Sequence, residues 1–192
     1  MPRLFTYTIP VDDGAAPNPF YGMCSLAICK PGIRRVAKVG DWVVGLGAKH
    51  TFSGKDLSGH VVYAMRVEQV VSLKEYDFLA PTNWPHRIPN AQSLALHERL
   101  GDCIYDFSKS KPTQRKGVHN AGNMETDLGG KNVLISRDYY YFGACAIKLP
   151  ESLLKVCHQT QGHRSTSNKP YFEEFVTWVR SIKPAKGQLY GW

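Results

Sequence analysis

Two groups of polar side chains are of the types that carry out acid–base chemistry. His119 lies in a polar segment, and the carboxylates nearest to it in sequence are Asp102 and Asp127. A histidine that is oriented by a carboxylate serves as a general base near neutral pH. Asp12 and Asp13, in a long loop, are a second place for such chemistry. None of these spacings matches a recognised catalytic motif, so a surface-loop histidine and turn-forming aspartates are the alternatives.

A larger set of residues has the types that recognise a nucleobase. A base needs a flat ring for stacking and polar groups that match its edge. The base-pocket candidates are Asn18, Lys49, His60, Tyr63, Trp84 and Phe142. Core packing of the rings, an Asx turn at Asn18, and an exposed hairpin loop around Lys49 and His60 are the alternatives.

Four cations are candidates for phosphate contacts. Lys30, Arg34 and Arg35 lie within six residues beside a proline, and Lys55 lies in a polar loop further along the chain. Arginine is suited to bidentate phosphate contacts, which dominate the affinity of proteins for nucleic acids. The alternative is a solvated basic helix face.

The overall charge favours a polyanionic partner. The 192 residues include 24 Lys and Arg against 16 Asp and Glu, which gives a net charge of +8. Residues 1–50 carry +3 and residues 141–192 carry +4, against 0 over residues 51–100 and +1 over residues 101–140. If both ends contribute to one basic face, the expected partner is DNA, RNA or a nucleotide.

The five cysteines are odd in number and scattered, which argues against a disulfide framework and is typical of a reducing cytoplasm. No CxxC pair is present, and Cys157, His158 and His163 lack an obvious fourth ligand. We therefore expect no metal and no cofactor. No apolar run approaches the roughly 20 residues of a membrane span, and the first ten residues are not typical of a signal peptide.

Hydrophobic patterning predicts strands with a few helices. The expected strands are 3–9, 42–46, 61–71, 103–107, 133–136 and 139–149, and the expected helices begin at Pro31 or cover 72–79, 151–159 and 170–182. Ser72 and Glu75 form a capping box, and residues 172, 175, 176 and 179 form one apolar helix face. This order predicts an α+β domain whose mixed sheet curls into a barrel, with a long loop over residues 10–22 and peripheral helices. No GxGxxG motif follows a strand, which disfavours a Rossmann sheet.

Two stretches carry a resemblance to known families. The block 40–45 (GDWVVG) and the run 59–67 (GHVVYAMRV) resemble a PUA-like barrel of the kind found in EVE, YTH and ASCH domains. The whole chain is similar to the nucleotide modification-associated domain 2 family through motifs spread over nearly its full length. These motifs are 12–20, 29–35, 40–45, 101–105 and 133–143.

The resemblance implies a single PUA-like domain over residues 1–192 with a role near modified bases. We expect a binding module that recognises a modified base, flipped or single-stranded, in a DNA modification or defence system. An enzyme that modifies a base or nucleotide with a His/Asp site is the alternative, and a protein-interaction accessory of such a system is a third. The absence of recognised enzyme motifs and the basic charge favour the binding module.

Overall fold

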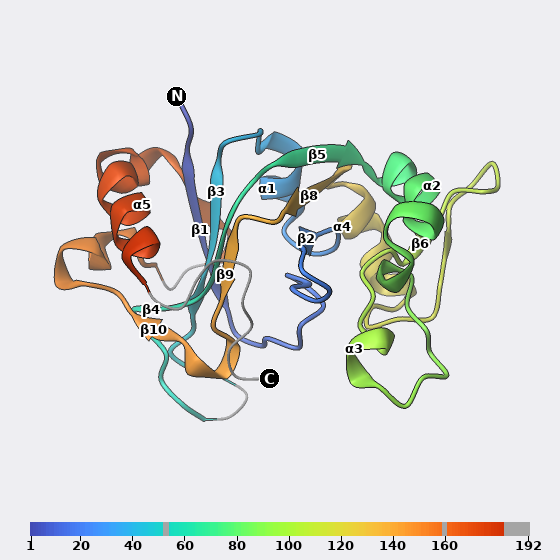
Figure 1. Cartoon of the computed structure of the whole chain (residues 1–192), viewed down its shortest axis with the longest axis horizontal. Coiled ribbons are helices and arrows are strands. Elements are labelled where there is room, and N and C mark those ends of the chain that lie inside the picture. Colours follow the sequence, from blue (N-terminus) through green and yellow to red (C-terminus); the bar gives the residue numbers. More distant parts are fainter. Residues whose placement is uncertain (52–53, 159–160, 183–192) are drawn as a thin grey trace. The chain divides into compact units, whose positions relative to one another are not determined.

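The chain forms two units, described by a computed structural model over residues 1–51, 54–158 and 161–182 (Figure 1). The first unit is built from residues 1–12, 38–68 and the chain from 136 onward, and the second from residues 13–37 and 69–135. Several sheets and helices are present, so the α+β class is confirmed. The expectation of one domain over the whole chain stays a prediction.

The first unit is built on one mixed sheet, with strands in the order β10-β4-β3-β1-β11 and β9 also paired with β4. Strands β1 and β3 run parallel, and the other pairs are antiparallel. The central strands are buried along nearly their whole length, which is why they appear in the sequence as continuous apolar runs. The strands are β1 (Leu4–Ile9), β3 (Trp42–Gly47), β4 (His60–Arg66), β9 (Tyr139–Tyr141), β10 (Ile147–Lys148) and β11 (His163–Arg164).

Helix α5 (Phe172–Ser181) packs on the core of this unit. Phe175 and Val179 are fully buried, and Phe172 and Val176 are partly buried against the same apolar cluster. The apolar face predicted for this helix is therefore confirmed. Three 3₁₀ helices complete the unit: η3 (Gly143–Cys145), η4 (Glu151–Val156) and η5 (Thr166–Tyr171).

The second unit contains a three-stranded sheet in the order β2-β8-β5 and a short β6–β7 hairpin. Its strands are β2 (Cys24–Leu26), β5 (Gln69–Ser72), β6 (Tyr105–Asp106), β7 (Thr113–Gln114) and β8 (Asn132–Ser136). Its helices are α1 (Pro31–Val36), α2 (Leu73–Asn83), η1 (Pro85–Arg87), α3 (Leu96–Arg99), η2 (Ala121–Asn123) and α4 (Met124–Leu128). The described chain holds no helix with the length and apolar character needed to cross a membrane.

The long loop after β1 is ordered by a buried arginine of the second unit. Arg87 is 2% exposed, and its guanidinium donates to the carbonyl oxygens of Asn18 (3.0 Å), Phe20 (2.8 Å) and Met23 (2.6 Å). These bonds add to the antiparallel bridge that Asn18 forms with Ser25 through two backbone hydrogen bonds.

The expected barrel differs from the observed sheets in three places. The predicted strand 61–71 divides into β4 and β5, which belong to different sheets, because the ladder with β3 ends at Arg66. The predicted strand 139–149 is interrupted by η3, where Gly143 adopts a φ of 53°. Strand 133–136 pairs in the sheet of the second unit. Among the described residues the main sheet is an open path, and no closed barrel is found.

The predicted helices are present with changed bounds. Ser72 caps α2 and accepts a hydrogen bond from the Glu75 N–H, but the helix continues through Pro81 to Asn83. The stretch from Glu151 is a 3₁₀ helix that ends at Val156, and the last residue of the predicted element, 159, lies outside the described residues.

Candidate active site

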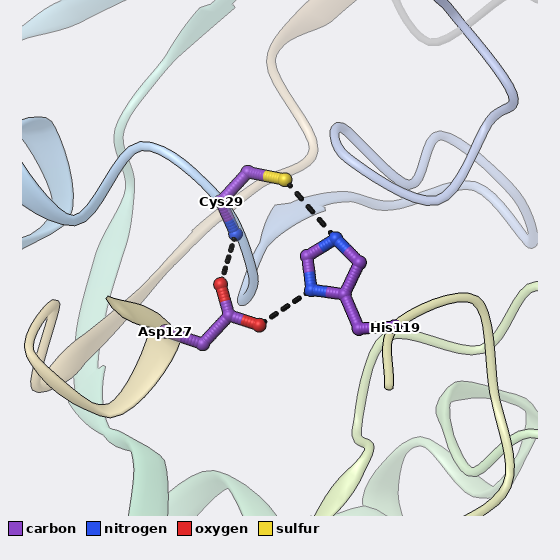
Figure 2. A group of neighbouring side chains, drawn as sticks. All are labelled: Cys29, His119 and Asp127. Atoms are coloured by element: carbon purple, nitrogen blue, oxygen red, sulfur yellow. Dashed lines mark hydrogen bonds and ion pairs between the residues drawn. The ribbon is translucent and has the colours of Figure 1, made fainter. Parts of the chain in front are cut away.

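Three side chains from distant parts of the sequence meet in the second unit (Figure 2). The imidazole of His119 lies between the other two, with Nε2 3.4 Å from Cys29 Sγ and Nδ1 2.5 Å from Asp127 Oδ2. A thiol, an imidazole and a carboxylate in this order form the relay by which a cysteine is activated as a nucleophile.

Cys29 lies in the turn that joins β2 to α1. Its φ is 57° and that of the following Lys30 is 41°, a left-handed conformation that non-glycine residues seldom adopt. Such conformations persist where surrounding contacts hold them, and they concentrate at functional sites. A sharp turn between a strand and a helix also presents the nucleophile of many hydrolases. The backbone at Cys29 thus has the strand–turn–helix geometry that is typical of a nucleophile.

His119 is held by its neighbours in the loop between β7 and η2. Gln114 of β7 donates from Nε2 to the His119 carbonyl oxygen at 2.7 Å. Asn120, the next residue, caps η2 through its side chain and forms a capping box with Asn123. These hydrogen bonds hold the backbone on both sides of His119, and the bond to Asp127 orients its ring.

Asp127 on α4 is hydrogen-bonded to both other members of the site. It is 1% exposed, and Oδ1 accepts a hydrogen bond from the Cys29 N–H at 2.7 Å. Oδ2 is bonded to His119 and also accepts from the Tyr105 hydroxyl at 2.8 Å. One carboxylate thus orients the histidine and also ties down the backbone of the cysteine.

These contacts set the charges of the site. The hydrogen bonds of His119 to Asp127 and Cys29 raise its pKa to about 10, against the opposing effect of burial. Burial alone would raise the pKa of Asp127, but its hydrogen bonds from His119, Tyr105 and the Cys29 N–H outweigh burial and lower it. At neutral pH His119 is therefore an imidazolium, with Nδ1 directed at Asp127 and Nε2 directed at the Cys29 sulfur.

Arg34 is fully buried and supports the relay through backbone carbonyl oxygens. Its guanidinium donates to the carbonyl oxygens of Cys29 (2.7 Å), Asp127 (2.5 Å) and Asn132 (2.9 Å). Burial lowers its pKa to about 10, which the nearby Asp127 carboxylate partly counteracts. A side chain at Gly130 would overlap this guanidinium, so glycine is needed there. Arg34 thus has a structural task, and no exposed surface remains on it for the phosphate that the sequence predicted.

The same three side chains are a candidate metal site, since their ligand atoms lie within 4.8 Å of one another. Both carboxylate oxygens of Asp127, however, already accept hydrogen bonds from the protein. Nδ1 of His119 is also engaged, which leaves only Sγ and Nε2 facing each other. The donor set therefore fits a proton relay better than a metal centre.

Four of the predicted base-pocket residues lie in the first unit. Tyr63 is fully buried with its hydroxyl 2.9 Å from that of Tyr7, and Phe142 is 1% exposed in the core. His60 is half-buried with Nδ1 2.9 Å from the Ser58 carbonyl oxygen, and Lys49 is exposed. The two rings have core positions, and only Lys49 and His60 reach solvent.

The other two predicted base-pocket residues lie in the second unit. Asn18 is 2% exposed; its amide donates to the Leu100 carbonyl oxygen at 2.8 Å, and its oxygen accepts from Arg87. Trp84 is half-buried with its ring centroid 5.5 Å from that of Tyr76. The six candidates therefore divide between the two units.

The other phosphate candidates differ in exposure. Lys30 is half-buried, with its pKa lowered by burial. Arg35 is exposed and donates to the Gly129 carbonyl oxygen at 3.2 Å, and Lys55 is exposed in the loop before β4.

The residue that sequence reasoning missed is Cys29. From the sequence, Cys29 was one of five scattered cysteines and the first residue of the motif 29–35, whereas His119 and Asp127 were considered as a possible pair. The available signal was its position, because Cys29 stands between an apolar strand and a proline that opens a helix. A strand, a sharp turn that carries the nucleophile and then a helix is the order seen in many hydrolases.

Comparison with known proteins gives one result. A family model described as nucleotide modification associated domain 2 matches residues 1–190, which spans both units. Neither curated proteins nor solved structures show a significant match.

Proposed function

Because this chain belongs to the nucleotide modification associated domain 2 family, we propose that it is a cysteine-dependent enzyme that acts on a nucleotide or nucleobase. The observation that carries the proposal is the relay from Cys29 through His119 to Asp127, with separations of 3.4 Å and 2.5 Å. The family description supports a role in a nucleotide modification system. The proposal develops the enzyme alternative of the sequence analysis and adds the nucleophile that it lacked.

In the proposed reaction the Cys29 sulfur attacks an electrophilic carbon of the substrate. The new S–C bond uses an electron pair of the thiolate, and the electrons displaced on the substrate take up the proton that His119 Nε2 carries. Asp127 holds the ring orientation and stabilises the imidazolium before transfer.

The reactivity of Cys29 tests this proposal. Alkylation by iodoacetamide at pH 7, followed site by site with peptide mass spectrometry, should be fast at Cys29. In His119→Gln it should slow roughly 10- to 100-fold, because a hydrogen bond to a charged group contributes about 1.5–3 kcal/mol. The exposed Cys145 is the internal control and should react equally in both proteins. Equal rates at Cys29 in both proteins would overturn the proposal.

Recognition of a modified base is a second candidate function, supported by a different part of the second unit. A cavity of about 190 Å³ is lined by Pro85, His86, Ile88, Asn90 and Glu98. The ring of Tyr21 stacks on that of His86 with centroids 4.0 Å apart, which places a flat aromatic surface beside polar groups.

A binding screen against nucleic acids that carry different modified bases tests this second function. Tyr21→Ala should reduce the preference among bases and leave salt-dependent background binding intact. Preference without any turnover would favour the binding module over the enzyme. Equal preference in Tyr21→Ala and wild type would remove this cavity as the place of recognition.

A further inference from the structure

Tyr105 contacts the same carboxylate oxygen that orients the imidazole. Its hydroxyl donates to Asp127 Oδ2 at 2.8 Å, and Nδ1 of His119 lies 2.5 Å from that same oxygen. Tyr105 and Asp127 are both buried, with exposed fractions of 2% and 1%. Because the two bonds share one acceptor, the hydroxyl helps to fix the point at which the imidazole is held.

The β6–β7 hairpin supports the relay at two points. Tyr105 of β6 pairs directly with Gln114 of β7, and the side chains of directly opposed residues lie on the same face of a sheet. Tyr105 donates to Asp127, and Gln114 donates to the His119 carbonyl oxygen. One cross-strand pair therefore holds both the carboxylate and the backbone of the histidine.

Arg115 fixes the backbone from which the Tyr105 side chain extends. Its guanidinium donates to the carbonyl oxygens of Cys103 and Tyr105, each at 3.1 Å. It also forms an ion pair with Asp77 of α2 at 2.7 Å. A planar guanidinium with several donors can make all of these contacts at once. The Tyr105 hydroxyl is therefore presented from a braced strand, which a residue that positions others requires.

The hydroxyl also helps to keep the buried carboxylate charged. Burial by itself would raise the pKa of Asp127, but the hydrogen bonds from His119 and Tyr105 help to lower it. Burial, and next its bond to Asp127, raise the pKa of Tyr105, so the hydroxyl stays protonated and remains a donor. An ionised carboxylate is the partner that holds an imidazolium most strongly.

We propose that Tyr105 is a positioning residue that acts through Asp127 to aim the imidazole at the Cys29 sulfur. This inference rests on the proposed function above, because it assigns a further residue to the same nucleophile. Loss of the hydroxyl leaves Oδ2 with one donor fewer, so the carboxylate and the His119 ring are held less firmly. Nε2 then faces Sγ for a smaller fraction of the time, and the sulfur reacts more slowly.

Iodoacetamide alkylation of Cys29 in Tyr105→Phe tests the proposal. At pH 7 the rate should fall roughly 3- to 10-fold relative to the wild type, because the net contribution of one hydrogen bond corresponds to a change of that size. Tyr76→Phe is the matched control. Tyr76 is also buried, and its hydroxyl donates to Asp102 Oδ1 at 2.8 Å, so this variant loses the same kind of bond outside the relay. Its Cys29 should react as fast as that of the wild type.

A double-mutant cycle separates this role from a merely structural one. In the His119→Gln background, Tyr105→Phe should slow alkylation of Cys29 by less than about twofold, because the imidazole through which the hydroxyl acts is absent. Slowing of the same size in both backgrounds would overturn the proposal. Circular dichroism and urea unfolding confirm that each variant is folded under the assay conditions, and Tyr76→Phe gives the loss of stability that a buried tyrosine bond alone produces.

The outcomes also separate this inference from the proposed function. If alkylation of Cys29 depends on His119 but is equally fast in Tyr105→Phe and in the wild type, the positioning role is overturned and the cysteine nucleophile stands. If Cys29 reacts at the same rate in the wild type and in His119→Gln, the proposed function fails and the positioning role fails with it.

Discussion

At the scale of single residues, the charge of His119 couples the site to pH. Its pKa rises from 6.5 to about 10 in the folded protein, so folding favours the protonated ring. The stability that this gives is fully present below pH 6.5 and is lost as pH rises toward 10. We expect the free energy of unfolding, measured with urea, to fall across this window in the wild type.

His119→Gln isolates this contribution. The variant should lose about 1–3 kcal/mol at pH 6.5, where the wild type has the charged hydrogen bonds, and much less near pH 10. Asp127 affects stability at acid pH. Its pKa is lowered in the folded protein, so its contribution to stability is lost as pH falls below 3.8, the ordinary pKa of an aspartate. A cost of His119→Gln that is the same at pH 6.5 and pH 10 would contradict the charge assignment.

Arg34 gives a second prediction at this scale. Arg34→Lys keeps a positive charge but cannot donate to three backbone carbonyl oxygens at once. We expect a loss of at least about 3 kcal/mol in urea unfolding, because each buried acceptor left without a donor costs about 1–3 kcal/mol. Arg35→Lys is the matched control and should change stability by less than about 0.5 kcal/mol, because Arg35 is exposed.

The same prediction extends to the nucleophile. If Arg34 braces Cys29, the rate of Cys29 alkylation should fall in Arg34→Lys and be unchanged in Arg35→Lys. An Arg34→Lys protein as stable and as reactive as the wild type would mean that the three carbonyl bonds do not position the relay.

Sequence reasoning found part of this site for a physical reason. His119 and Asp127 stand eight residues apart and could be considered together, although their spacing matches no motif. Cys29 is separated from His119 by 90 residues, so only the fold brings the two together. The burial of Arg34 was equally hidden, because an arginine on a short helix has the same sequence pattern whether it faces solvent or the interior.

At the scale of elements, α5 provides the clearest test of packing. Phe175 is fully buried and lies 6.2 Å, centroid to centroid, from Trp42 of β3. Phe175→Ala should cost about 3–5 kcal/mol and lower the thermal midpoint, because it leaves a cavity in the core of the first unit. Thr177→Ala on the exposed face is the control. An unchanged midpoint for Phe175→Ala would mean that α5 is not part of the core.

Local periodicity predicted where helices and strands lie better than it predicted which strands pair with one another. The 3.6-residue spacing located α5, and the apolar runs located β1, β3 and β4. The end of β4 at Arg66 was missed because the apolar pattern continues across it. The choice between two sheets depends on partners far along the chain, such as β8 for β5, and those contacts leave no local signal.

At the scale of the whole molecule, the net charge of +8 gives a prediction about binding. Affinity for single-stranded DNA, measured by fluorescence anisotropy, should fall with salt at a log–log slope of roughly −0.7 for each phosphate contacted. Lys30→Ala and Arg35→Ala should each make that slope shallower by roughly 0.7, the contribution of one phosphate contact. Lys74, exposed in a segment of zero net charge, is the control.

A slope that is flat in the wild type would show that the positive charge serves solubility alone. If Lys74→Ala reduced the slope as much as Lys30→Ala and Arg35→Ala, binding would depend on the overall positive charge and not on defined phosphate contacts. The C-terminal part of the basic end, Lys183 and Lys186, lies outside the described residues.

The interleaved order of the two units has a consequence for synthesis on the ribosome. All residues of the second unit, including the relay, have been translated once the chain reaches Ile135. At that moment the first unit has only β1, β3 and β4, while β9, β10 and α5 are still to be made. Domains fold as units, and incomplete ones expose apolar surface. The nascent chain can therefore bring Cys29, His119 and Asp127 together early, whereas the apolar central strands of the first unit stay uncovered until residues from 136 onward are made.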